Sequence, residues 1–288
     1  MKIYDRHKRQ YIEAGQYGQG KLEFLYGSAV GRLLLKPVIS PFASRLYGFY
    51  NSLPVSAGRI PAFVEKYHIP LGDYEKTTYR SFNEFFTRKR RAEALHIDRD
   101  ADSLIAPADA KLLVYRVTDG LKVSVKGRDY TLGELTDNRL DMSGYGGGLC
   151  LVFRLCMEDY HRYCFIDSGR LTRHFRVKGR LHTVSSVSKD YPIFKENSRE
   201  ISVCETARFG EIIQIEVGAL LVGRIVNHGK TSFGKGEEKG WFEPGGSTIV
   251  LLLRRDVAVI DRDITEQSDA GIETVVCYGE RIGKRIHD

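Results

Sequence analysis

The stretch "WFEPGGSTIVLLLRR" (residues 241–255) joins a glycine-containing turn to a strongly apolar run. A short apolar run that follows a turn signal is typical of a buried β-strand, so we expect a strand to begin at Ser247. Gly245 and Gly246 can adopt backbone conformations that other residues avoid. Ser247 is therefore expected to have a permissive backbone on its N-terminal side and a fixed strand on its C-terminal side.

Runs of the same kind recur after residue 100, separated by glycine-containing turns. They are "KLLVYRV" (111–117), "LKVSV" (121–125), "LCLVFRL" (149–155), "EIIQIEVG" (211–218) and "LLVGRIV" (220–226). They do not alternate with helical segments, which disfavours a doubly wound parallel sheet. We therefore expect a mostly antiparallel β core over residues 101–288.

The first hundred residues show helical periodicity instead. Helices are expected over 22–34, 41–53 and 59–68, and a fourth is expected from Ser81 into the basic end of "SFNEFFTRKRR" (81–91). Ser40 is a candidate N-cap for the second helix, and Ser81 with Glu84 matches the capping-box pattern. The predicted fold class is α+β, with a helical, membrane-associating region of residues 1–100 packed on the β core.

The chain has 288 residues and a formal net charge of +7. Residues 1–50 contain eight Lys and Arg against three acids, so most of the excess lies in the helical region. A basic amphipathic helix can dock on an anionic lipid surface, or it can bury its apolar face against the β core, and the sequence leaves both alternatives open. A nucleic-acid partner is not expected, because no module of that kind is recognisable.

The five cysteines include no C-x-x-C pair, which favours a reducing compartment over a disulfide framework. The polar start "MKIYDRHKRQ" does not resemble a signal peptide. No run approaches the roughly 18–20 apolar residues that a spanning helix needs. We expect any contact with a membrane to be at its surface.

The position of Ser247 suggests a chemical role for its hydroxyl. A serine that follows a permissive glycine can attack the preceding carbonyl and shift the acyl group from nitrogen to oxygen. Loss of that acyl group by β-elimination would leave dehydroalanine, which hydrolyses to a pyruvoyl group at a new N-terminus. This chemistry needs a base for the hydroxyl. The alternative is that the segment is an ordinary hairpin turn.

Two further stretches carry titratable candidates. His161 lies in "FRLCMEDYHRYCFIDSG" (153–169), where it can act as acid or base near neutral pH or have a structural role. Asp109 lies in "LIAPADAKLLVY" (104–115) between two β runs, where the alternative is an ordinary turn aspartate. Cys156, His161 and Cys164 match no common zinc spacing, so no metal is expected.

Several motifs in order resemble the phosphatidylserine decarboxylase family, in its bacterial branch. They are "FNEFFTRKR" (82–90), "APADAKL" (106–112), "DYHR" (159–162), "FKENSRE" (194–200), "VGALLVGRI" (217–225) and "GEEKGWFEPGGST" (236–248). The resemblance extends from about residue 20 to residue 255. Each motif alone is only moderately specific, whereas their order and separations together are distinctive.

The resemblance implies a pyruvoyl enzyme that arises from a proenzyme. Self-cleavage between Gly246 and Ser247 would leave a β chain of 1–246 and an α chain of 247–288, and Ser247 would become the covalent pyruvoyl cofactor. Its ketone would form a Schiff base with the serine amine of phosphatidylserine and accept the electrons released as CO2 leaves, as pyridoxal phosphate does. The product would be phosphatidylethanolamine.

The family assigns a role in decarboxylation to the histidine that matches His161. Its processing triad corresponds to Asp109, Ser247 and the position three residues after His161. That position is Cys164, because "DYHRYC" stands where the family has DYHRxH. The base for self-cleavage is then Cys164, or His161 in a second role, or another histidine, unless the chain never matures. The other candidate histidines are His174, His182 and His228.

The resemblance also implies partners. One is the substrate, phosphatidylserine in an anionic membrane, and the other is a second copy of the chain in a homodimer. The expected location is the cytoplasmic side of the cell membrane, with peripheral attachment. Two alternatives would share the fold. One is a pyruvoyl decarboxylase of another amino-acid-like substrate, and the other is an uncleaved, non-catalytic lipid-binding relative.

Overall fold

The computed structural model describes residues 2–13, 28, 40–125, 128–179, 196–218, 224–245 and 247–287. Some of the sequence predictions concern residues outside these ranges. They are the helix over 22–34 (Ser28 excepted), the candidate base His182, the first part of "LLVGRIV", and Gly246.

Strand β15 (Ser247–Leu253) is the apolar run expected from the sequence, and it lies inside a large sheet. Within the described ranges this sheet has ten strands, in the order β13-β9-β10-β11-β15-β7-β4-β17-β1-β2. All neighbours in it pair antiparallel except β1 and β17, which confirms the predicted antiparallel core. The other nine strands are β1 (Lys2–Asp5), β2 (Gln10–Glu13), β4 (Ala110–Arg116), β7 (Leu149–Leu155), β9 (Gly169–Val177), β10 (Arg199–Thr206), β11 (Gly210–Gly218), β13 (Ser232–Phe233) and β17 (Glu273–Val276).

Smaller sheets flank the large one. One contains β12 (Ile225–Asn227), β14 (Glu238–Phe242) and β8 (Arg162–Cys164). A second contains β16 (Ala258–Ile260), β18 (Arg281–Arg285) and β3 (Ser103–Ile105), and a third contains β5 (Lys122–Val125) and β6 (Arg128–Thr131). Strand β14 carries the chain toward Ser247, and β8 begins directly after His161.

Both faces of β15 are buried, which explains why its sequence is continuously apolar. Ile249, Leu251 and Leu253 belong to one hydrophobic cluster, and Val250 and Leu252 belong to another on the opposite face. Because side chains alternate along a strand, Ser247 lies on the same face as Ile249. The phenylalanines of the "FNEFF" segment pack into the cluster on that face.

The helices form mainly in the first hundred residues, as expected. The α-helices are α3 (Pro41–Ser52), α4 (Ile60–Tyr67), α5 (Phe82–Phe86), α6 (Leu132–Leu135) and α8 (Arg262–Asp269). The 3-10 helices are η1 (Pro54–Arg59), η2 (Leu71–Asp73), η3 (Ala92–Ala94) and η4 (Ser143–Tyr145). Strands β1 and β2 were not predicted, and they extend the large sheet with residues from the beginning of the chain.

The helix caps agree with the sequence only in part. The Ser40 hydroxyl accepts a hydrogen bond from the Ala43 amide at 3.2 Å, which confirms the N-cap of α3. At α5 the Ser81 hydroxyl accepts from the Glu84 amide at 3.2 Å, but the Glu84 carboxylate accepts from the amide of Arg80 at 2.7 Å. The return bond of the expected capping box is therefore displaced by one residue.

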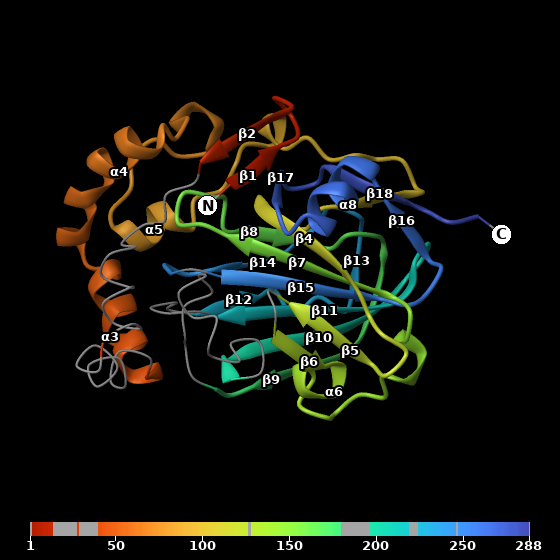
Figure 1. Ribbon diagram of the computed structural model, residues 1–288. Helices are drawn as coiled ribbons and strands as arrows, with labels where there is room; N and C mark the ends of the chain where they lie inside the picture. The colour runs from red at the N-terminus through yellow and green to blue at the C-terminus, as the bar shows by residue number, and fades with distance from the viewer. Residues whose placement is uncertain are drawn as a thin grey trace.

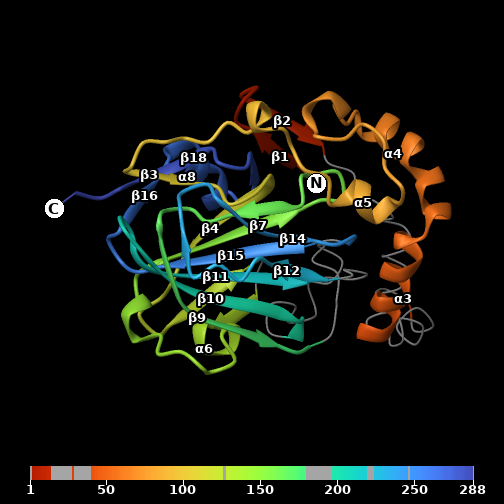
Figure 2. The same ribbon diagram turned by 180° about the vertical axis from the view of Figure 1, so that it is seen from behind.

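Helices α3, α4 and α5 lie together beside one end of the large sheet (Figure 1). Phe63 of α4 packs its ring edgewise against Phe82 and Phe85, which links α4 to α5. Figure 2 shows the same arrangement from behind, with α8 over β4 and β17 at a distance from these helices. None of the described helices has the length and apolar character that would let it cross a lipid bilayer.

Candidate active site

Ser247 occupies the first position of β15, between Gly218 of β11 and Leu155 of β7. Its side chain is fully buried, with 0% exposure. Gly245 has a φ of 144°, which residues with a side chain rarely adopt, so the chain enters the strand through a turn that glycine permits. The sequence prediction of a serine held at the start of a buried strand is confirmed.

The Ser247 hydroxyl faces an imidazole. Its Oγ lies 3.4 Å from Nδ1 of His161, which is also fully buried. The other ring nitrogen of His161, Nε2, lies 2.9 Å from the carbonyl oxygen of Cys156. Because a carbonyl oxygen can only accept, Nε2 carries the proton and Nδ1 has a free lone pair. The arrangement therefore presents a proton acceptor to the serine hydroxyl.

The surroundings of His161 keep the ring neutral. Burial, reinforced by the positive charge of Arg88, lowers the pKa of His161 to about 3. The ring stacks on Phe86 of α5, with centroids 4.0 Å apart and an interplanar angle of 27°. The His161 carbonyl also accepts from the amide of Phe242 at the end of β14. His161 is thus fixed by α5 on one side and by β14 on the other.

The loop that carries His161 is held by buried charges. Lys111 donates to both carboxylate oxygens of Asp159, at 2.6 and 2.8 Å, and Asp159 also accepts from the Cys156 amide at 2.6 Å. The guanidinium of Arg88 donates to the carbonyl oxygen of Glu158 at 3.1 Å. Lys111, Arg88 and Phe86 were not singled out from the sequence. Their signal was their position inside the motifs "APADAKL" and "FNEFFTRKR".

Asp109 lies immediately before β4, and its carboxylate is engaged away from the serine. Arg90 donates to both of its oxygens, at 3.1 and 2.5 Å, and the Tyr278 amide donates to Oδ1 at 2.8 Å. Arg90 in turn stacks over the ring of Tyr160, 4.6 Å from its centroid. In the described part of the chain no contact joins the Asp109 carboxylate to Ser247 or His161.

Cys164 is buried at the end of β8, with its Sγ 3.8 Å from the carbonyl oxygen of Ala106. Burial raises the pKa of this thiol to about 12. Its amide donates to the carbonyl of Pro107, which ties β8 to the segment before Asp109. Among the described contacts of the thiol, none reaches Ser247 or His161.

The other described candidate histidines have different partners. His174 on β9 contacts Glu200 at 3.0 Å and Ser202 at 3.1 Å, and His228 contacts Glu238 at 2.7 Å. His161 is therefore the candidate base that the described residues place on the serine. In the described contacts, Nε2 of His161 and Sγ of Cys164 each face a backbone carbonyl oxygen, that of Cys156 and that of Ala106 respectively.

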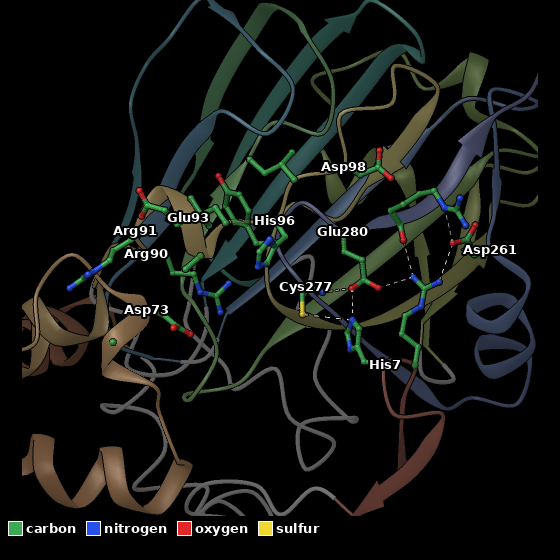
Figure 3. Close-up of a pocket in the computed structure, with 17 residues that line it drawn as sticks. His7, Asp73, Arg90, Arg91, Glu93, His96, Asp98, Asp261, Cys277 and Glu280 are labelled. Carbon is green, nitrogen blue, oxygen red and sulfur yellow. Dashed lines mark hydrogen bonds and ion pairs between the residues drawn. The ribbon is translucent and has the colours of Figure 1, made fainter.

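A pocket of about 1450 Å³ is lined by two of the residues that bind Asp109 (Figure 3). Arg90 and Tyr278, which both bind Asp109, contribute to its lining. Ser247 and His161 do not line it. The pocket is therefore in contact with the partners of Asp109 and does not include the buried serine.

Comparison with known proteins adds an independent observation. The family model described as phosphatidylserine decarboxylase matches residues 82–284. The phosphatidylserine decarboxylase proenzyme 2 of Clostridium acetobutylicum is 46% identical over 284 residues, which is 98% of each chain. The phosphatidylserine decarboxylase proenzyme of Desulfitobacterium hafniense strain Y51 is 40% identical over 293 residues, covering 99% of this chain and 98% of its own.

Proposed function

The chain belongs to the phosphatidylserine decarboxylase family, and on that premise we propose that it is a proenzyme of a carboxy-lyase that converts phosphatidylserine to phosphatidylethanolamine and CO2. The observation that carries the proposal is the buried pair of Ser247 Oγ and His161 Nδ1, 3.4 Å apart. A fully buried serine hydroxyl opposite a neutral imidazole is suited to intramolecular attack.

We assign the base of self-cleavage to His161. Nδ1 takes the proton of the Ser247 hydroxyl, and the oxygen attacks the carbonyl carbon of Gly246. The C–N bond then breaks, the amide nitrogen takes up a proton, and an ester remains. Removal of the α-proton of residue 247 expels the Gly246 carboxylate and leaves dehydroalanine. Addition of water and loss of ammonia produce the pyruvoyl group.

Cys164 is the weaker candidate for this role. With a pKa of about 12, roughly one thiol in 10⁵ is ionised at neutral pH. Its burial in the apolar cluster on the face of Ile249 disfavours a thiolate, and this effect outweighs the hydrogen bond from Tyr278 that would stabilise one. Cys164 stands where the family has its second histidine. This difference is compatible with self-cleavage, because His161 can accept the proton of the Ser247 hydroxyl.

The residues around Ser247 fit a pyruvoyl group. The site is enclosed, the serine begins a fixed strand, and a ring nitrogen faces the side chain that would be converted. The pyruvoyl group supplies an electrophilic carbonyl that takes up the electron pair released when the substrate carboxylate leaves as CO2. His161 is placed to hold or deliver a proton beside that position, and Phe86 fixes the plane of its ring.

An exposed apolar face on α3 supports a lipid substrate. Phe42, Leu46 and Phe49 are 74%, 60% and 64% exposed, and their spacing places them on one side of the helix. Val55, just after α3, is 69% exposed. These four side chains, here called the α3 apolar face, suit insertion into the boundary of an anionic membrane. We propose peripheral attachment at the cytoplasmic side through this face and, on the family resemblance, a homodimer.

The processing test compares intact masses under denaturing conditions. The wild-type protein should give chains 1–246 and 247–288, whereas Ser247→Ala should remain whole. His161→Gln should slow cleavage by about 10²–10⁴-fold, the usual contribution of a general base. Cys164→Ala should cleave at the wild-type rate. If His161→Gln were cleaved and Cys164→Ala remained whole, the base of self-cleavage would be the Cys164 thiol.

Substrate identity is tested separately on the processed protein. CO2 release should occur with phosphatidylserine in mixed micelles and should be absent with free serine. Preference for the free amino acid would support the alternative of a pyruvoyl decarboxylase with a soluble substrate. An uncut chain that binds vesicles but releases no CO2 would support the non-catalytic alternative.

A further inference from the structure

The parallel pairing of β1 with β17 places two potential metal ligands side by side. Tyr4 pairs with Thr274 and Asp5 with Val275, so both strands run in the same direction in this register. His7 follows Asp5 by two residues, and Cys277 follows Val275 by two residues. The Cys277 Sγ lies 3.9 Å from Nε2 of His7.

A tight turn adds a third ligand. The segment from Cys277 to Glu280 connects β17 to β18, and the Glu280 amide donates to the Cys277 carbonyl at 3.0 Å. Gly279 adopts a φ of +80°, where a side chain would also collide with Ile97. The turn brings Oε2 of Glu280 to 3.0 Å from Nε2 of His7. Figure 3 shows the three side chains converging at the pocket, whose lining does not include Ser247.

Neighbouring residues orient these ligands. His7 Nδ1 lies 3.5 Å from Oδ1 of Asp5, so the second ring nitrogen faces a carboxylate while Nε2 faces the cluster. Arg6 contacts Oε1 of Glu280 at 3.2 Å, while Oε2 accepts from the Cys277 amide at 2.8 Å and faces Nε2 of His7. Metal-bound histidines commonly have such a carboxylate on the distal nitrogen. The positive charge of Arg6 is offset by its ion pairs with Asp261 and Asp263.

We propose that His7, Cys277 and Glu280 bind a transition-metal ion of the zinc class through Nε2, Sγ and Oε2. The three ligand atoms lie within 4.8 Å of one another, and the neighbouring atoms of a tetrahedral zinc site are about 3–4 Å apart. A nitrogen, sulfur and oxygen set suits Zn²⁺ and does not suit Mg²⁺ or Ca²⁺. Binding replaces the thiol proton, which passes to solvent. A fourth ligand from outside the protein, such as water, would complete a four-coordinate set.

The proposed metal site would contain ligands from both chains of the processed protein. His7 lies in the segment that would become the β chain, and Cys277 and Glu280 lie in the segment that would become the α chain. One ion would therefore join the two chains through residues that do not include Ser247. This consequence rests on the proposed cleavage, whereas the metal site itself does not.

The test uses purified protein, first stripped with a chelator and then titrated with Co²⁺ or Zn²⁺. The wild type should bind one Co²⁺ and develop a thiolate-to-cobalt charge-transfer band, which Zn²⁺ should abolish by displacement. Cys277→Ser should lose the band, and His7→Gln should weaken affinity by at least ~10–100-fold. His96→Gln removes another histidine of the same pocket and should leave binding unchanged.

Two controls keep the result interpretable. Each metal-free variant should unfold thermally like the metal-free wild type, which separates loss of a ligand from loss of the fold. His7→Asn provides a second variant if His7→Gln is unstable. Absence of the band in the wild type, or equal affinity in Cys277→Ser, His7→Gln and His96→Gln, would show that these residues form only the His7–Glu280 ion pair.

Discussion

At the scale of single residues, the environment of His161 decides what the imidazole can do. Burial against Phe86 and the nearby Arg88 lower its pKa to about 3, so the ring is neutral throughout the physiological range. A neutral ring is always ready to accept the serine proton. The same low pKa makes it a weak base, so its action depends on its being held beside the hydroxyl, with Nδ1 3.4 Å from Oγ.

This leads to a pH prediction for maturation. An ordinary histidine with a pKa near 6.5 would lose its basic form as the pH falls through that value. The pKa of His161 is lowered to about 3, so the basic form persists far below neutrality. The first-order rate of proenzyme cleavage should be nearly constant from about pH 8 to about pH 5. A half-maximal rate near pH 6.5 would show that the ring titrates normally.

Some residue contacts follow from the sequence and others do not. The strand that begins at Ser247 was predictable from its apolar run, and its alternation fixes the face on which the hydroxyl lies. The stacking of Phe86 on His161 and the direction of the Cys164 thiol were not predictable, because both depend on the packing of α5 and β8. Sequence position suggested Cys164 as a base, and its burial, which raises the pKa of the thiol, depends on tertiary packing that the sequence does not show.

At the scale of elements, α5 shows where tertiary packing overrides helical periodicity. The sequence predicts a helix that continues into the basic end after Phe86, yet α5 stops at Phe86. Arg88 turns inward to the Glu158 carbonyl and lies over the rings of Tyr74 and Phe85. A guanidinium with these partners cannot also remain on the solvent side of a continuing helix. The helix therefore ends where its basic residues begin to support the loop of His161.

Helix α3 shows the opposite outcome, since its caps and bounds match the prediction closely. The sequence left open whether its apolar side packs on the core or meets lipid. Phe42, Leu46 and Phe49 are all more than half exposed, so packing on the core does not account for them. Helix α3 contacts α5, which in turn carries the ring stacked on His161, so the two helices lie together beside one end of the sheet (Figure 1).

The contribution of the α3 apolar face to membrane binding can be tested by substitution. Burying one Leu or Phe side chain is worth about 1.5–3 kcal/mol, or at least tenfold in binding. Leu46→Glu with Phe49→Glu should therefore reduce partition onto phosphatidylserine vesicles by more than ~10-fold. Activity on detergent-dispersed substrate should be retained. Val259→Glu changes another exposed apolar residue, 57% exposed on β16, and should bind vesicles like the wild type. Equal losses in both variants would argue against a specific face.

At the scale of the whole molecule, the segment after the proposed cleavage point contributes strands that lie between strands of the preceding segment. Strand β15 lies between β11 and β7, and β17 lies between β4 and β1. Helix α8 packs against β4, where the Ser268 hydroxyl accepts from the Val114 amide at 3.0 Å. A cut before Ser247 thus leaves two chains that share one sheet and one core.

This topology predicts concentration-dependent unfolding. Once cleaved, the protein unfolds into two separate chains, so mass action makes its denaturation midpoint rise with protein concentration. A tenfold increase should add about 1.4 kcal/mol for each additional chain released. The uncut Ser247→Ala variant is the matched control and should show a smaller dependence, set only by any self-association. Identical dependence in the two proteins, measured by urea titration, would contradict the shared-sheet arrangement.

Ser247 is the first residue of a strand that lies inside the sheet, and this position implies that folding precedes self-cleavage. The hydroxyl meets the imidazole only after β7, β11, β14 and α5 have assembled around β15. A chain that folds wrongly would keep its serine and never acquire the reactive carbonyl. Self-cleavage would then depend on correct folding, so that only chains with the native structure become active and misfolded chains remain inactive.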